Sequence, residues 1–94
     1  CFFQSLINLG YGTSVMELRR QASLHGGQSN INNNGVWAND QDIIAVANAL
    51  GIRIRVISLD MQYQANQDIT YGNNGSVVLL VHIFGGHFVP LRDE

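Results

Sequence analysis

The sequence contains one cysteine, Cys1, whose thiol becomes a nucleophile once it ionises. Apolar residues at helical spacing follow it, so Cys1 is predicted to lie at a helix N-terminus, where unpaired N–H groups favour the thiolate. Such a nucleophile needs a general base, and histidine commonly fills that role. His87 is the strongest of the three histidines, because the preceding Gly85 and Gly86 permit close approach of a substrate. The residues therefore indicate Cys1 as nucleophile and His87 as general base.

Each of these residue types also has a purely structural interpretation. A single cysteine is often a small buried apolar residue. His82 alternates with core residues and fits a packed or solvent-facing strand position, whereas His25 lies in a polar segment and fits a solvated loop. Three scattered histidines and one cysteine lack the paired spacing of metal ligands. No metal site and no cofactor are therefore predicted.

The apolar periodicity predicts the elements that must position Cys1 and His87. Three helices are expected over residues 1–9, 14–24 and 40–50, followed by strands over residues 52–58, 69–71, 77–84 and 87–91. Segregation of helices and strands favours an α+β fold, with helices packed on a small, mainly antiparallel sheet. Pro90 places the last strand at an edge, since proline cannot donate to an interior ladder. Nothing in residues 1–94 indicates a second domain.

Local signals predict how the helices begin and which faces they bury. Ser14 and Glu17 fit a capping box, and the second helix is expected to turn Arg19 and Arg20 to solvent. Asn39 or Asp40 is expected to cap the third helix, whose apolar stripe is predicted to be formed by four residues. These are Ile43, Ile44, Ala47 and Leu50, with Gly51 as the stop.

The connecting segments carry further signals. Residues 25–35 form a polar stretch that fits either a surface loop or a mobile lid. Trp37 is expected to pack over the third helix. Residues 73–75, Asn-Asn-Gly, are typical of a hairpin turn between the second and third strands.

Composition limits the classes of partner. The chain is 46% hydrophobic and 13% charged, which excludes a disordered chain, and its formal net charge is −2. All five basic residues are arginine, too few and too scattered for nucleic acid or an anionic membrane surface. The apolar run at residues 77–84 is far shorter than the ~18 residues of a membrane helix. We therefore expect neither nucleic acid nor a membrane as a partner.

Three blocks of the sequence, in this order, resemble the ovarian-tumour (OTU) family of cysteine proteases. Cys1 and the next five residues, Phe-Phe-Gln-Ser-Leu, are similar to the family's nucleophile motif. Residues 37–52, Trp-Ala-Asn-Asp-Gln-Asp-Ile-Ile-Ala-Val-Ala-Asn-Ala-Leu-Gly-Ile, resemble its tryptophan loop and following helix. Residues 87–91, His-Phe-Val-Pro-Leu, resemble its final histidine block.

The resemblance implies a papain-like core in which Cys1 attacks an isopeptide or peptide carbonyl and His87 transfers the proton. Ubiquitin or a ubiquitin-like protein is the implied substrate. Two positions depart from the family pattern. The Asp-Gly pair that usually precedes the cysteine is not in this sequence, so residues 1–94 are expected to be one OTU-like domain that lacks upstream residues. Val89 stands where many members have Asn or Asp, so the third catalytic residue lies upstream of Cys1 or is Asp93.

The leading hypothesis is a deubiquitinase-type cysteine hydrolase. A Cys-His pair also serves glutamine deamidases, transglutaminases and self-processing toxin proteases, and a free α-amino group on Cys1 would suit an N-terminal nucleophile hydrolase. A catalytically inactive OTU-like binding module is the alternative from another class. The absence of lysine suggests a secreted bacterial effector or toxin in a host cytosol, where it would offer no lysine for ubiquitin attachment.

Overall fold

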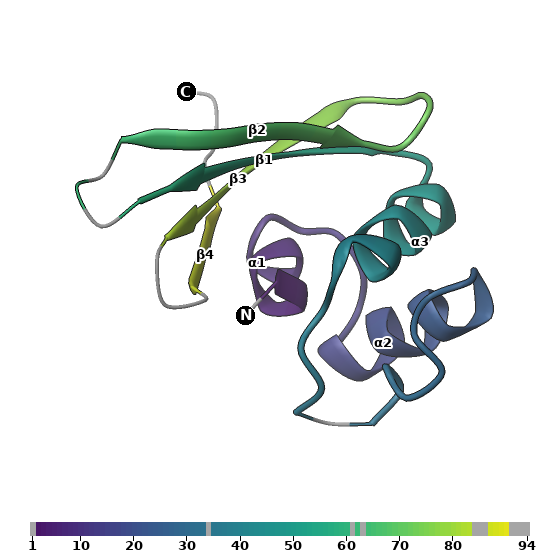
Figure 1. The fold of residues 1–94 in the computed structure, drawn as a ribbon. Helices are drawn as coiled ribbons and strands as arrows, with labels where there is room; N and C mark the ends of the chain where they lie inside the picture. Colours follow the sequence, from purple (N-terminus) through teal and green to yellow (C-terminus); the bar gives the residue numbers. More distant parts are fainter. Residues whose placement is uncertain (1, 34, 61, 63, 84–86, 91–94) are drawn as a thin grey trace.

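A computed structural model describes residues 2–33, 35–60, 62, 64–83 and 87–90. Within these residues the chain forms three helices followed by four strands (Figure 1). The elements are α1 (Phe2–Asn8), α2 (Val15–Leu24), α3 (Asp40–Leu50), β1 (Arg53–Leu59), β2 (Ala65–Tyr71), β3 (Val77–Ile83) and β4 (His87–Pro90). This order confirms the α+β fold, although β2 begins at residue 65 and not at 69.

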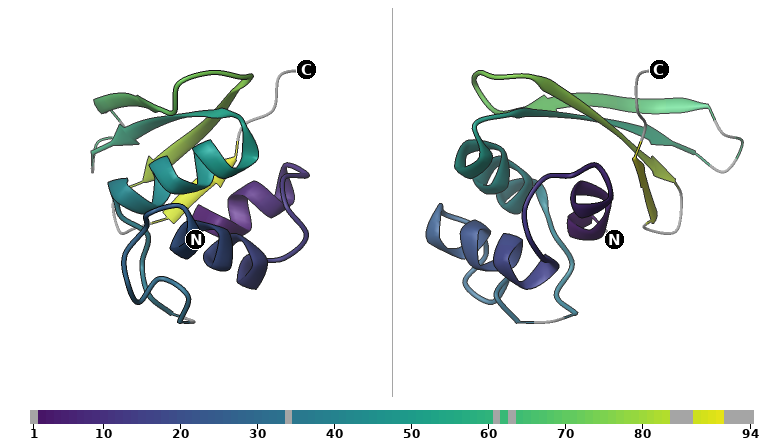
Figure 2. Two further views of the ribbon diagram at one scale, coloured as in Figure 1. Left: turned by 90° about the vertical axis from the view of Figure 1, so that its right-hand side faces the viewer. Right: turned by 180° about the vertical axis from the view of Figure 1, so that it is seen from behind.

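The described strands form one mixed sheet in the order β2-β1-β3-β4. β1 pairs antiparallel with β2 and parallel with β3, and β3 pairs antiparallel with β4. Antiparallel pairings therefore predominate, as predicted, and β4 with Pro90 lies at an edge. The three helices lie on one face of this sheet (Figures 1 and 2).

The predicted hairpin turn at residues 73–75 is wrong. β2 and β3 lie on opposite sides of β1, so the connection between them crosses the end of β1. β2 is exposed along nearly its whole length, whereas Ile54 and Val56 of β1 and Leu80 of β3 are buried. Pairing the two apolar strands at the centre of the sheet buries more apolar surface than a β2–β3 hairpin would.

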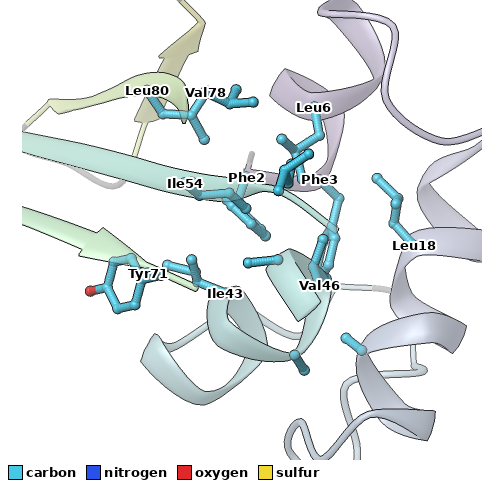
Figure 3. Close-up of a cluster of buried hydrophobic side chains, with 14 of the residues drawn as sticks. Phe2, Phe3, Leu6, Leu18, Ile43, Val46, Ile54, Tyr71, Val78 and Leu80 are labelled. Carbon is cyan, nitrogen blue, oxygen red and sulfur yellow. The ribbon is translucent and has the colours of Figure 1, made fainter. Parts of the chain in front are cut away.

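The hydrophobic core lies between the sheet and the helices (Figure 3). Its largest fully buried apolar side chains are Phe2, Phe3, Leu6, Leu18, Ile31, Val46, Ile54 and Leu80. They come from all three described helices, from both central strands and from the segment between α2 and α3. α1 is therefore held in place by the core itself.

α3 has the cap that the sequence predicts. The Asn39 side chain accepts a hydrogen bond from the Asp42 N–H, and the Asp42 carboxylate accepts one from the Asn39 N–H. Gly51 ends the helix with a φ of 67°, in the left-handed region that glycine tolerates. The inward position expected for Ile44 is wrong, because it is 43% exposed while Val46 faces the core.

Two local expectations next to α2 and α3 are also wrong. Ser14 caps α2 by accepting from the Glu17 N–H at 3.1 Å, but the Glu17 carboxylate binds Arg20 and does not complete a capping box. Trp37 is 72% exposed and does not cover α3. Its carbonyl accepts from Gln28 Nε2 at 3.0 Å, which fixes the backbone here while the indole ring stays in solvent.

The face of the sheet opposite the helices is apolar where β1 and β3 end. The register places Ile57 beside Val81 and Leu59 beside Ile83, and all four are half-buried. None of the described helices lies on this face (Figure 2). No helix in the described part of the chain has the length and apolar character needed to cross a membrane.

The buried Asp42 carboxylate gives the first testable prediction. It is fully buried and accepts hydrogen bonds from Gln28 N at 2.8 Å, Gln28 Nε2 at 2.6 Å and Asn39 N at 2.9 Å. Asp42→Ala leaves these donors without that partner, so we expect the free energy of unfolding to fall by about 3 kcal/mol. Urea denaturation measures the change.

Asp68→Ala, which removes an exposed carboxylate, is the control, and its expected loss of unfolding free energy is below about 1 kcal/mol. Equal losses in the two variants would contradict the prediction.

Tyr71 gives a prediction for alkaline pH. Burial, together with a 2.9 Å hydrogen bond from its hydroxyl to Asp40 and the charge of Asp40, raises the pKa of Tyr71 from 10.0 to about 12. The folded state therefore favours the neutral phenol. The resulting stability is complete below pH 10 and is lost as pH rises from 10 towards 12.

Urea denaturation of wild type and Tyr71→Phe across this range checks the prediction, because phenylalanine has no proton to lose. The advantage of the wild type over Tyr71→Phe should be constant up to about pH 9 and shrink above about pH 10. A difference that does not change with pH would show that Tyr71 ionises alike in the folded and unfolded chains.

Candidate active site

The structure describes the backbone of His87 but not Cys1. Cys1 lies outside the described residues, and the described chain begins at Phe2, the first residue of α1. His87 is the first residue of β4, where its backbone pairs with Ile83 of β3, but its side chain lies outside the description. Asp93 also lies outside it. The pairing of Cys1 with His87, and the third catalytic residue, therefore stay predictions.

α1, which begins directly after Cys1 in the sequence, and β4, which begins with His87, are packed against each other. The N-terminal end of α1 lies beside the start of β4 in every view (Figures 1 and 2). Ser5 Oγ, on α1, donates a hydrogen bond to the Phe88 carbonyl at 3.1 Å. The rings of Phe2 and Phe88 meet edge to face, with centroids 5.7 Å apart. Thus the residue after Cys1 contacts the residue after His87.

A second ring contact holds Phe88 from the side of the sheet. His82 is the cross-strand partner of Phe88, and their rings are stacked with centroids 4.5 Å apart and an interplanar angle of 17°. His82 is half-buried, which confirms its interpretation as a strand residue. His25 is exposed just after α2, which confirms the solvated loop position. His82 therefore packs against Phe88, whereas His25 lies at the end of α2.

The expectation that Arg19 faces solvent is wrong, whereas Arg20 is exposed as expected. Arg19 is only 5% exposed. Its guanidinium carbon lies 4.7 Å from the centroid of the Phe3 ring on α1. Burial lowers the pKa of the Arg19 guanidinium, and the nearby Asp42 charge opposes that shift.

Arg19 Nη1 holds the segment between α2 and α3. It donates to three carbonyls of that segment, those of Ile31 at 3.1 Å, Asn33 at 3.2 Å and Val36 at 2.7 Å. Ile31 itself is completely buried, so this polar stretch has an apolar anchor. This segment packs against α2 and buries Arg19 there, a position that the apolar periodicity of α2 places outside its buried face. The sequence carried one signal for this arrangement, the isolated Ile31 among polar residues.

α1 begins with the residue that follows Cys1 in the sequence, and β4 begins with His87. The first turn of α1 contains no acidic residue, so no carboxylate in it opposes a thiolate at the preceding residue. Among the described residues, no group of histidine, cysteine and acidic side chains is placed to hold a metal ion.

Three solved structures that share this fold are OTU domains. The Hazara virus OTU bound to ubiquitin is 18% identical with a TM-score of 0.76, and the match covers 98% of this chain and 74% of that one. The viral OTU domain protease from Dera Ghazi Khan virus is 14% identical with a TM-score of 0.74, covering 98% and 75%. The OTU domain of OTUD1 is 15% identical with a TM-score of 0.75, covering 99% and 79%.

No protein-family model matches the sequence, and no curated protein is similar to it. The likeness is therefore one of structure. It extends over nearly the whole chain and is accompanied by the packing of α1 on β4 described above. The chain has the fold of an OTU domain.

The contact between Ser5 and Phe88 can be tested directly. Ser5→Ala removes the 3.1 Å hydrogen bond to the Phe88 carbonyl at a buried position, so we expect unfolding to become easier by about 1 kcal/mol. Amides of β4 should exchange with deuterium faster, because α1 holds that strand less firmly. Ser23→Ala, on the exposed side of α2, is the control. Unchanged exchange of β4 in Ser5→Ala would refute the role given to this contact.

Proposed function

We propose that this chain is a cysteine-dependent isopeptidase or protease of the OTU type, with Cys1 as nucleophile and His87 as general base. The observation that carries the proposal is the packing of the first turn of α1 on β4, in a chain with the OTU fold. Phe2 and Phe88 are the immediate neighbours of the two proposed catalytic residues, and their rings are in contact. This contact supports a short distance between Cys1 and His87.

The proposed reaction proceeds through a thioester. The Cys1 thiolate attacks the carbonyl carbon of the isopeptide bond, and protonated His87 gives its proton to the departing lysine amine as the C–N bond breaks. Water then attacks the thioester carbonyl while neutral His87 takes a proton from it. The C–S bond breaks, which releases the carboxylic acid product and restores the Cys1 thiolate beside protonated His87. The acid then loses its proton to solvent and becomes a carboxylate.

The proposed substrate is a linkage made by ubiquitin or a ubiquitin-like protein. One solved structure with this fold, the Hazara virus OTU, is bound to ubiquitin, which supports the choice. The proposed setting is a host cytosol, reached as a secreted effector or toxin. The absence of lysine supports it, because such a chain has no lysine side chain to accept ubiquitin.

Incubation with di-ubiquitin of each linkage tests the proposal. The intact domain, with any natural residues that precede Cys1, should cleave at least one linkage type. Cys1→Ala should abolish cleavage, and His87→Gln should lower kcat by about 100-fold or more, because the proton transfers lose their base. His25→Gln is the matched control, since His25 is exposed just after α2, and it should keep wild-type activity.

Other outcomes discriminate among the remaining hypotheses. Failure of the intact domain to cleave any linkage would contradict the deubiquitinase proposal. A deamidation or transamidation mass shift in a treated protein, with no cleavage, would assign the same pair to acyl transfer. Ubiquitin binding without labelling by an electrophilic ubiquitin probe would indicate a binding module.

A further inference from the structure

A chain of side-chain contacts connects the two ends of the described structure. It begins at Arg19 on α2, whose guanidinium lies 4.7 Å from the centroid of Phe3. Phe3 meets Phe2 edge to face at 5.2 Å, Phe2 meets Phe88 at 5.7 Å, and Phe88 stacks on His82 at 4.5 Å. These five side chains come from α2, α1, β4 and β3, and we call them the aromatic row. The row passes through the residues next to Cys1 and His87.

Arg19 fixes one end of the aromatic row to the rest of the molecule. Its Nη1 donates to three backbone carbonyls between residues 31 and 36, although this nitrogen carries two hydrogens. The two N–H groups are therefore shared among three acceptors. The carbon of the same guanidinium lies over the Phe3 ring. One side chain thus couples the segment before α3 to the first turn of α1.

This use of a buried cation is costly for the fold. Arg19 is 95% shielded from solvent, its Nε has no hydrogen-bond partner among the described residues, and none of the described carboxylates forms a direct ion pair with it. An apolar side chain would fill the same space without these costs. In return, the arginine fixes the carbonyls of residues 31, 33 and 36 in position relative to the Phe3 ring.

We propose that Arg19 is a positioning residue for the Cys1–His87 site, acting through Phe3 and Phe2 on the first turn of α1. The proposal rests on the function given above. Loss of the guanidinium removes its contact with the Phe3 ring and its hydrogen bonds to the carbonyls of residues 31, 33 and 36, so the first turn of α1 is held less firmly against β4. A displacement of about 1 Å at a nucleophile lowers the rate of the chemical step by roughly 100-fold.

Four variants separate positioning from general stability. Arg19→Met keeps the volume and removes the donors, and Arg19→Lys keeps the charge and three donors without the planar face. Arg20→Met changes the exposed neighbouring arginine on the same helix. Tyr71→Phe removes a hydrogen bond on β2, the strand at the opposite edge of the sheet from β4. All are assayed at an equal interval below their own melting temperatures.

Three measurements are made on each variant. Cleavage of di-ubiquitin gives kcat and KM. The rate of Cys1 alkylation by iodoacetamide against pH, followed by mass spectrometry of the peptide that carries Cys1, reports on the thiol without any ubiquitin. Fluorescence anisotropy of Trp37, the single tryptophan among residues 1–94, reports on the motion of the segment before α3. Arg19 binds this segment at the neighbouring Val36 carbonyl.

The expected result is specific to Arg19. Arg19→Met should lower kcat by about 10- to 100-fold with KM within about threefold of wild type. Its alkylation profile should move to higher pH, towards that of an ordinary thiol, and the Trp37 anisotropy should fall. Arg19→Lys should lie between Arg19→Met and wild type, while Arg20→Met and Tyr71→Phe should match wild type in kcat and alkylation.

Two results would overturn the positioning role. One is a folded Arg19→Met with the kcat and alkylation profile of wild type. The other is an equal loss of kcat in Tyr71→Phe, which would reduce the effect of Arg19 to stability. If wild type cleaves no di-ubiquitin, the proposed function fails. The alkylation profiles alone then test whether Arg19 positions Cys1. Identical profiles in wild type and Arg19→Met would then refute its positioning role.

Discussion

The burial of α1 is the constraint on which the rest of the structure depends. This helix has only seven residues, far fewer than a helix needs to be stable alone in water. It forms because Phe2, Phe3 and Leu6 are almost completely removed from solvent between α2 and the sheet. The start of the described chain is thereby placed against β4, at the other end of the sequence. Ser5 and Phe88, 83 residues apart, are brought within hydrogen-bond distance.

Two buried charged side chains extend this order to the segment between α2 and α3. Arg19 binds its carbonyls, and Asp42 binds the N–H and side-chain amide of Gln28 within it. Long polar stretches usually remain solvated and mobile, because their backbone groups find no partners inside the protein. Here the hydrogen-bond partners are side chains of α2 and α3, so the segment packs against the core and contributes the buried Ile31 to it.

The parts that could be predicted from the sequence are those that depend on neighbouring residues. The helix ends at Asn39 and Gly51 and the edge position of Pro90 follow from local backbone chemistry. The parallel pairing of β1 with β3 could not be predicted, because the turn at 73–75 does not specify which strand the chain will meet. The burial of Arg19 was missed for the same reason, since its partners lie 12 to 17 residues away. Residue types and the OTU resemblance indicated Cys1 and His87 as candidates, but the contacts that bring α1 to β4 are long-range.

The dependence of the fold on long-range contacts explains how an OTU fold can persist at 14% to 18% identity. The proposed catalytic residues are the sequence neighbours of Phe2 and Phe88, which belong to the interface of α1 with β4. The contacts of that interface involve a backbone carbonyl and aromatic rings. A backbone carbonyl is present whatever the residue, and ring contacts tolerate changes in the surrounding aliphatic core. Geometry at such a site depends on how firmly two buried elements are packed, and less on the connecting loops. Arg19 belongs to the same packed core and contacts Phe3 on α1, and this is why we propose that a residue outside both α1 and β4 affects the geometry of the site.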